Sequence, residues 1–141
     1  MIKALLVLAG FAAGAFVTYS FTQVQEARAA ANRVYELRTY HTLPGRLPAL
    51  QARFRDHTTK IFEKHGMKNV GYWVPQDAPS SDNTLIYVLS YDSRDAAKKA
   101  WLDFRNDADW KVAQKASEAD GKIVEKVESV YMSPTDYSPV K

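Results

Sequence analysis

Cysteine is absent from the 141-residue chain, and this absence excludes several kinds of chemistry. A chain without thiols forms no disulfide, presents no thiolate nucleophile and offers no sulfur ligand to zinc. The six glycines stand singly along the chain, so the sequence has no glycine-rich loop of the kind that holds nucleotide phosphates. A G-x-S-x-G nucleophile elbow is missing as well, which argues against a hydrolase of that type.

A large excess of one charge is also missing. The chain has 19 basic and 16 acidic residues and a formal net charge of +3, and the basic residues are scattered among acidic ones. Nucleic-acid binding usually requires a basic patch or stripe, so we expect no nucleic-acid partner. A content of 46% hydrophobic and 25% charged residues is typical of one globular domain.

The N-terminal segment has the pattern of an export signal. Lys3 precedes the apolar run ALLVLAGFAAGAF, and a small-residue A-x-A tripeptide ends at Ala29. We therefore expect residues 1–29 to be a signal peptide and residues 30–141 to be a periplasmic or secreted domain. The alternative is an uncleaved membrane anchor, because the apolar stretch approaches the lower length limit of a membrane span.

The rest of the chain predicts a ferredoxin-like α+β domain. Alternating patterns or short apolar runs between turn residues predict strands at 34–40, 69–75, 84–91 and 122–133. Apolar residues at helical spacing predict helices over about 47–65 and 93–104, with a further short helix before Gly121. The order β-α-β-β-α-β implies an antiparallel sheet with its helices on one face.

Several residues mark the expected helix ends. Gly66 is suited to the left-handed position that follows a helix. Ser93 is a candidate N-cap for the second helix, and Asp107 or Asp109 is a candidate N-cap for the short helix.

The first strand carries an unusual polar row. Side chains alternate along a strand, so Glu36, Arg38 and Tyr40 share one face and Leu37 lies on the other. If Leu37 faces the helices, the polar row lies on the uncovered face of the sheet. A second copy of the sheet is the simplest cover for that face, and we therefore expect a homodimer with an enclosed space. The alternative role for Glu36 and Arg38 is an ion pair that supports the dimer.

Six short motifs together resemble the NIPSNAP domain over about residues 33–140. They are YELRTY with the following PG, FEKHG at 62–66, GYW at 71–73, the Trp101 to Trp110 segment, Ser133-Pro134 and the YSP of 137–139. The resemblance implies a dimeric α/β barrel, a fold shared with cofactor-free monooxygenases of antibiotic biosynthesis and with haem-binding chlorite-dismutase-like proteins. It implies little about the reaction. Ala108-Asp109 departs from the Pro-Glu that the family often shows.

The three histidines do not form a recognisable metal site. His57 and His65 are eight residues apart on the first predicted helix, roughly 12 Å along its axis, and so do not share one ion. His41 stands apart at the end of the first strand. A haem group would require only one axial histidine, but no feature of the sequence selects one. We therefore expect no metal and no cofactor.

The leading functional hypothesis is a homodimer that binds a small apolar or aromatic molecule in the barrel. Arg38 and Glu36 are the candidate catalytic residues, and Tyr40, Trp73 and Tyr87 are the candidate ligand-binding residues. For an enzyme of this kind, oxygenation or isomerisation of an enolisable aromatic substrate is expected, with Arg38 stabilising an anion and Glu36 or a histidine accepting a proton. The alternative is a non-catalytic protein-interaction or assembly module.

Overall fold

The computed structural model describes residues 33–140. The signal peptide or anchor expected at residues 1–29 lies outside this range. Within residues 33–140, no helix has both the length and the apolar character required to cross a membrane.

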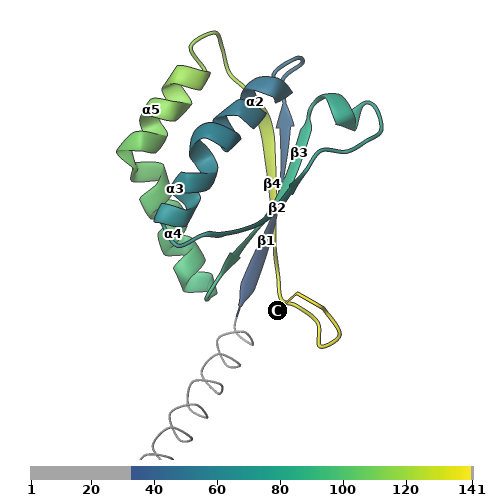
Figure 1. The fold of residues 1–141 in the computed structure, drawn as a ribbon, viewed down its shortest axis with the longest axis vertical. Coiled ribbons are helices and arrows are strands. Elements are labelled where there is room, and N and C mark those ends of the chain that lie inside the picture. Colours follow the sequence, from purple (N-terminus) through teal and green to yellow (C-terminus); the bar gives the residue numbers. More distant parts are fainter. Residues whose placement is uncertain (1–32, 141) are drawn as a thin grey trace, which may run out of the picture. The chain divides into compact units, whose positions relative to one another are not determined.

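The described chain forms one sheet and one layer of helices. In order, the elements are β1 (Val34–Thr42), α2 (Leu47–Arg53), the π-helix η1 (Phe54–Thr58), α3 (Thr59–Lys64), β2 (Lys68–Trp73), the 3-10 helix η2 (Ser80–Asp82), β3 (Thr84–Tyr91), α4 (Arg94–Asn106), α5 (Ala108–Ser117) and β4 (Val124–Met132). The strands pair antiparallel in the order β2-β3-β1-β4. Helices α2 to α5 cover one face of this sheet (Figure 1). The ferredoxin-like α+β fold is thereby confirmed.

The expected helix ends are also confirmed. Ser93 Oγ accepts a hydrogen bond of 3.1 Å from the backbone N–H of Ala96 at the start of α4. Asp107, rather than Asp109, caps α5, because its Oδ1 accepts a 3.0 Å hydrogen bond from the backbone N–H of Trp110. Gly66 has a φ of +75° after α3, a left-handed conformation that glycine adopts without steric cost.

The first helix differs from the sequence expectation, because it is interrupted by the π-helix η1. The backbone N–H of Thr59 bonds the carbonyl of Phe54, five residues earlier. Thr58 Oγ1 donates a second bond of 3.1 Å to the carbonyl of Arg53. A single wide turn of this kind accommodates an extra residue, and such turns are frequent at functional sites.

The polar row of β1 faces the helices, so its expected position on the uncovered face is wrong. Glu36, Arg38 and Tyr40 lie opposite three core residues of β3, namely Leu89, Tyr87 and Leu85. The physical reason is that the polar groups find partners in the helical layer: Trp101 of α4 donates a hydrogen bond to Glu36. Leu37 lies on the opposite face, because neighbouring residues of a strand alternate.

The sheet and the helices enclose a core rich in aromatic side chains. Phe62 packs against Tyr87, Trp101 and Phe104 with ring centroids 4.9 to 6.0 Å apart. Coverage is weaker at β4, the edge strand next to β1, where Val127 is 41% exposed although it pairs with Tyr40. This incompletely covered edge is where the candidate site lies.

Candidate functional site

A buried carboxylate connects the sheet to the helices. Glu36 is 0% exposed. Its Oε1 accepts hydrogen bonds of 2.6 Å from Arg38 and from Ser129, and its Oε2 accepts bonds of 2.6 Å from Tyr91 and 2.7 Å from Trp101. Burial by itself would raise the pKa of Glu36, but the hydrogen bonds from Ser129, Tyr91 and Trp101 and the charge of Arg38 outweigh it and lower the pKa. Glu36 is therefore ionised at neutral pH.

Arg38 is held in a fixed position beside this carboxylate. Its guanidinium carbon lies 4.2 Å from the ring centroid of Trp101 and 5.5 Å from that of Tyr40, which are cation–π distances. Burial by itself would lower the pKa of Arg38, but its neighbours Tyr87, Tyr40 and Glu36 outweigh that effect and raise it. Arg38 thus supplies a permanent positive charge within the helix-facing layer.

Neutral phenol groups adjoin the guanidinium. The ring centroids of Tyr40 and Tyr87 lie 5.4 Å apart, and Tyr72 stacks on Tyr87 at the same centroid distance of 5.4 Å. Burial raises the pKa of both Tyr72 and Tyr87 above the ordinary value of 10.0. The hydroxyl of Tyr87 is buried beside Tyr40. Tyr72 and Tyr87 are therefore hydrogen-bond donors rather than bases.

A cavity of about 370 Å³ lies between the helices and the sheet, at the Tyr40 end of the row. Five aromatic side chains contribute to its lining: Tyr40, Phe54, Phe62, Phe104 and Trp110. The other lining residues are Arg53, Thr58, Gln114, Glu118, Lys122, Val124 and Val127. Of the twelve lining residues, five are aromatic, two are valines and five are polar or charged.

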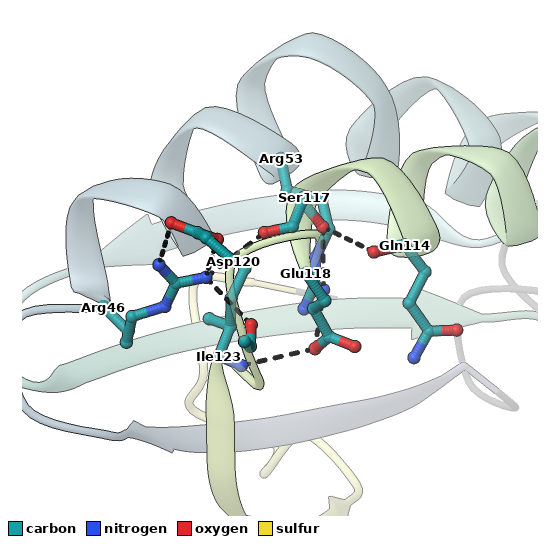
Figure 2. A network of polar contacts seen from close by, with 8 residues as sticks. Arg46, Arg53, Gln114, Ser117, Glu118, Asp120 and Ile123 are labelled. Carbon is teal, nitrogen blue, oxygen red and sulfur yellow. Dashed lines mark hydrogen bonds and ion pairs between the residues drawn. The ribbon is translucent and has the colours of Figure 1, made fainter.

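The π-helix helps to build this cavity. Arg53, Phe54 and Thr58, which precede or belong to the π-helix, all contribute to the lining. Arg53 extends from its helix towards the end of α5 (Figure 2), where its Nη1 lies 3.3 Å from both Ser117 Oγ and Glu118 Oε1. The wide turn therefore contributes both apolar and charged groups to the same wall.

The cavity rim is anchored by the connection from α5 to β4. Arg46 donates hydrogen bonds of 2.8 and 2.7 Å to the two carboxylate oxygens of Asp120 and one of 2.9 Å to the carbonyl of Gly121 (Figure 2). The backbone N–H of Ile123 bonds Glu118 Oε1 at 3.4 Å. The bonds from Ile123 and Arg53 hold the carboxylate of Glu118, which is itself a lining residue.

The structure brings four of the five candidate residues together. Tyr40 lines the cavity, Tyr87 packs against it, and Arg38 and Glu36 follow along the same strand face. Trp73 lies on the opposite face, because it pairs with Ile86, whose β3 neighbours Leu85 and Tyr87 face the helices. Its side chain is 53% exposed. A ligand-binding role for Trp73 stays a prediction, separate from this cavity.

The sequence reasoning missed Arg53. Its position next to Phe54, at the margin of the apolar stripe of the first helix, is the signal that could have drawn attention to it. The short helix α5 places Trp110 in the cavity lining.

Metal-binding geometry is not found in residues 33–140, where no group of three or more histidine, cysteine, aspartate or glutamate residues is placed to hold an ion. His65 Nε2 lies 2.8 Å from Asp107 Oδ2, and His41 Nε2 lies 3.7 Å from Glu128 Oε1. Each of these histidines therefore has a carboxylate neighbour on a different element.

Comparison with known proteins points to one family. The family model described as NIPSNAP matches residues 35–139. A NIPSNAP family protein of unknown function from Agrobacterium tumefaciens is 24% identical, with a TM-score of 0.67 over 79% of this chain and 96% of that one. A NIPSNAP-like domain protein from Burkholderia xenovorans is 14% identical, with a TM-score of 0.66 over 77% and 90%.

The same fold occurs outside proteins of that name. SnoaB, a cofactor-independent oxygenase from Streptomyces nogalater, is 14% identical to the chain, with a TM-score of 0.53 over 77% of this chain and 99% of that one. At such identity the likeness establishes the fold alone. No curated protein shows significant sequence similarity to the chain.

Proposed function

Because the chain belongs to the NIPSNAP family, we propose that it binds a small aromatic or mainly apolar molecule in the cavity between its helices and its sheet. The observation that carries this proposal is the cavity itself, about 370 Å³ in volume and lined by five aromatic side chains. Ligand sites in proteins typically enclose about 300 to 1,000 Å³ and combine apolar walls with a few polar groups. The volume suits a ligand of one or two rings.

The proposed reaction class, if the bound molecule is a substrate, is cofactor-free oxygenation or isomerisation of an aromatic compound. The support is the fold that the chain shares with SnoaB, an oxygenase that needs no cofactor, and such support is an analogy of fold. Arg38 is not itself a lining residue, but its guanidinium carbon lies 5.5 Å from the ring of Tyr40, which lines the cavity, and we propose that its positive charge stabilises an anion formed beside Tyr40.

The proposed role of Glu36 is to position Arg38, whereas the sequence suggested that Glu36 accepts a proton. All four of its hydrogen bonds come from donors within 2.7 Å, and its pKa is lowered. A carboxylate so fully bonded is poorly suited to accept a proton from a substrate. We assign Glu36 the positioning of Arg38 through their 2.6 Å ion pair.

Homodimerisation through the uncovered face of the sheet is part of the same proposal. Trp73 is 53% exposed and Val130 56% exposed, and both belong to the strand positions that point away from the helices. Covering such apolar surface is favourable in water. Sedimentation velocity over a range of micromolar concentrations tests this point, and a monomer throughout that range would contradict it.

An exported location is also proposed, from the signal-like pattern of residues 1–29. N-terminal sequencing of protein recovered from the native host tests it. A mature N-terminus close to Ala30 is expected after cleavage, whereas a sequence that starts at Met1 would support the membrane-anchor alternative.

A second candidate function is a non-catalytic interaction or assembly module. The exposed Trp73 and Val130 favour it, because apolar surface of this kind also suits another polypeptide. Native mass spectrometry of gently purified protein discriminates between the two functions. A retained small molecule supports cavity binding, whereas a retained foreign polypeptide with an empty cavity would favour the interaction module.

A further inference from the structure

Arg53 places a positive charge beside the aromatic side chains that line the cavity. Its side chain is only 3% exposed, although it belongs to a surface helix. Its guanidinium carbon lies 5.3 Å from the ring centroid of Trp110, which also lines the cavity. A charge that is buried in this way requires good partners, because desolvation of an ion is costly.

The hydrogen bonds of Arg53 are longer than those of Arg38 and Arg46. Its two side-chain hydrogen bonds, to Ser117 and Glu118, are both 3.3 Å long. Arg38 bonds its carboxylate at 2.6 Å, and Arg46 bonds Asp120 at 2.7 and 2.8 Å. Charge-assisted bonds usually measure about 2.7 to 2.9 Å. In the described part of the chain, the buried Nε of Arg53 has no hydrogen-bond partner, and the same holds for Arg33, Arg38 and Arg46, so the two long bonds are what distinguish Arg53 from Arg38 and Arg46. Its donor capacity is therefore incompletely used.

A ligand carboxylate would satisfy these donors. Guanidinium and carboxylate groups form paired hydrogen bonds of matching geometry, and arginine is favoured wherever a planar anion is recognised. Glu118 has a side chain that is 27% exposed at the rim, so it is able to turn towards water when another carboxylate arrives. Lys122 adds a second positive charge to the lining.

From these observations we infer that the cavity receives a small aromatic monocarboxylate, with its rings against the aromatic wall and its carboxylate on Arg53 in place of Glu118. This inference rests on the proposed function and adds the charge and chemical class of the ligand. The inference also gives the π-helix a role. The wide turn begins directly after Arg53, so this part of the chain supplies both the proposed anion-binding group, Arg53, and an aromatic lining residue, Phe54.

The test compares two ligands of nearly equal shape, 2-naphthoate and naphthalene-2-carboxamide, by isothermal titration calorimetry at neutral pH. The wild-type protein is expected to bind the carboxylate about tenfold or more tightly, since a hydrogen bond to a charged group contributes about 1.5 to 3 kcal/mol. Arg53→Met should lose this preference and retain affinity for the carboxamide. Arg55→Met is the matched control, because Arg55 is exposed on the same turn and is not among the lining residues.

Glu118→Gln provides a second test that does not depend on the folding of the Arg53 variant. Glutamine keeps an acceptor oxygen for Ile123 but removes the competing charge, so the affinity for 2-naphthoate should rise several-fold while that for the carboxamide stays unchanged. An affinity for 2-naphthoate that is unchanged or reduced in Glu118→Gln would overturn the inference.

The remaining outcomes separate the inference from the proposed function. Binding of both ligands with equal affinity, or an undiminished carboxylate preference in Arg53→Met, would overturn the inference and leave cavity binding intact. Failure of the wild-type protein to bind either ligand would count against the proposed function as well.

Discussion

The indole Nε1 of Trp101 donates a 2.7 Å hydrogen bond to Oε2 of Glu36, and this bond joins helix α4 to strand β1. Tyr91 donates to the same oxygen from β3, and Ser129 donates to the other oxygen from β4. One fully buried carboxylate therefore connects three strands and a helix. Arg38 donates the fourth hydrogen bond to Glu36 and is held in place by it. The network therefore supports the adjoining cavity wall.

Replacement of Glu36 by glutamine should destabilise the fold by about 2 to 4 kcal/mol, since the amide group faces donors and leaves the partly buried Arg38 without its counter-ion. Urea unfolding followed by circular dichroism measures this change. Glu125→Gln is the control, because Glu125 is an exposed residue of β4, and its effect should be small. Equal unfolding midpoints for the two variants would contradict a structural role for the Glu36 network.

Acid should lower the free energy of unfolding of the wild-type protein more than that of the Glu36→Gln variant. The pKa of Glu36 is lowered from its ordinary value of 4.5, so the folded state favours the ionised form. The resulting stability is present above pH 4.5 and is lost as the pH falls towards the lower pKa of the folded state.

The free energy of unfolding, measured between about pH 6 and pH 3, should therefore fall more steeply in the wild-type protein than in Glu36→Gln. Other acidic groups with lowered pKa values, such as Asp107 and Asp120, contribute to both proteins and cancel in the difference. If the free energy of unfolding fell equally with pH in the two proteins, the lowered pKa of Glu36 in the folded state would be contradicted.

Gly71 and Trp73 should prove energetically coupled on the uncovered sheet face. A Cβ atom added at Gly71 would lie 2.5 Å from the end of the Trp73 ring, so the ring must move in Gly71→Ala. A double-mutant cycle should show that the same substitution is better tolerated in a Trp73→Ala background, with a coupling energy of about 0.5 to 1 kcal/mol. Additive effects would mean that the ring does not lie over Gly71 in solution.

Much of the fold follows from local signals in the sequence. Ser93 was expected to cap one helix and either Asp107 or Asp109 the next, and the side chains of Ser93 and Asp107 accept the capping bonds. Gly66 takes the left-handed conformation expected of it. The short apolar run at 84–91 predicts strand β3, and six of its eight residues are buried. These features depend on neighbours within a few residues, which is why the pattern predicts them.

The orientation of β1 was not predictable in the same way. Alternation separates Glu36 from Leu37, but which of the two faces the helices depends on partners distant in sequence, such as Trp101 and Ser129. An intuitive preference for burying leucine over glutamate therefore failed, because four donors compensate the buried charge.

The π-helix was missed for a related reason. The apolar positions of residues 47–65 fit a helical stripe whether or not one turn is wider. The contact that marks the turn, from Thr58 Oγ1 to the carbonyl of Arg53, is visible only in three dimensions. The sequence therefore identified Tyr40 as a candidate residue, but it did not identify Arg53, which precedes the π-helix and lines the same cavity.

The three tryptophans of the chain lie in three different surroundings and allow one decisive measurement. Trp110 lines the cavity, Trp101 bonds Glu36, and Trp73 lies on the uncovered sheet face. Each indole N–H gives its own peak in a ¹H–¹⁵N correlation spectrum, which can be followed during titration with 2-naphthol. Binding in the cavity predicts a saturable shift of the Trp110 peak with little change at Trp73, whereas a shift confined to Trp73, or no saturable shift at all, would contradict it.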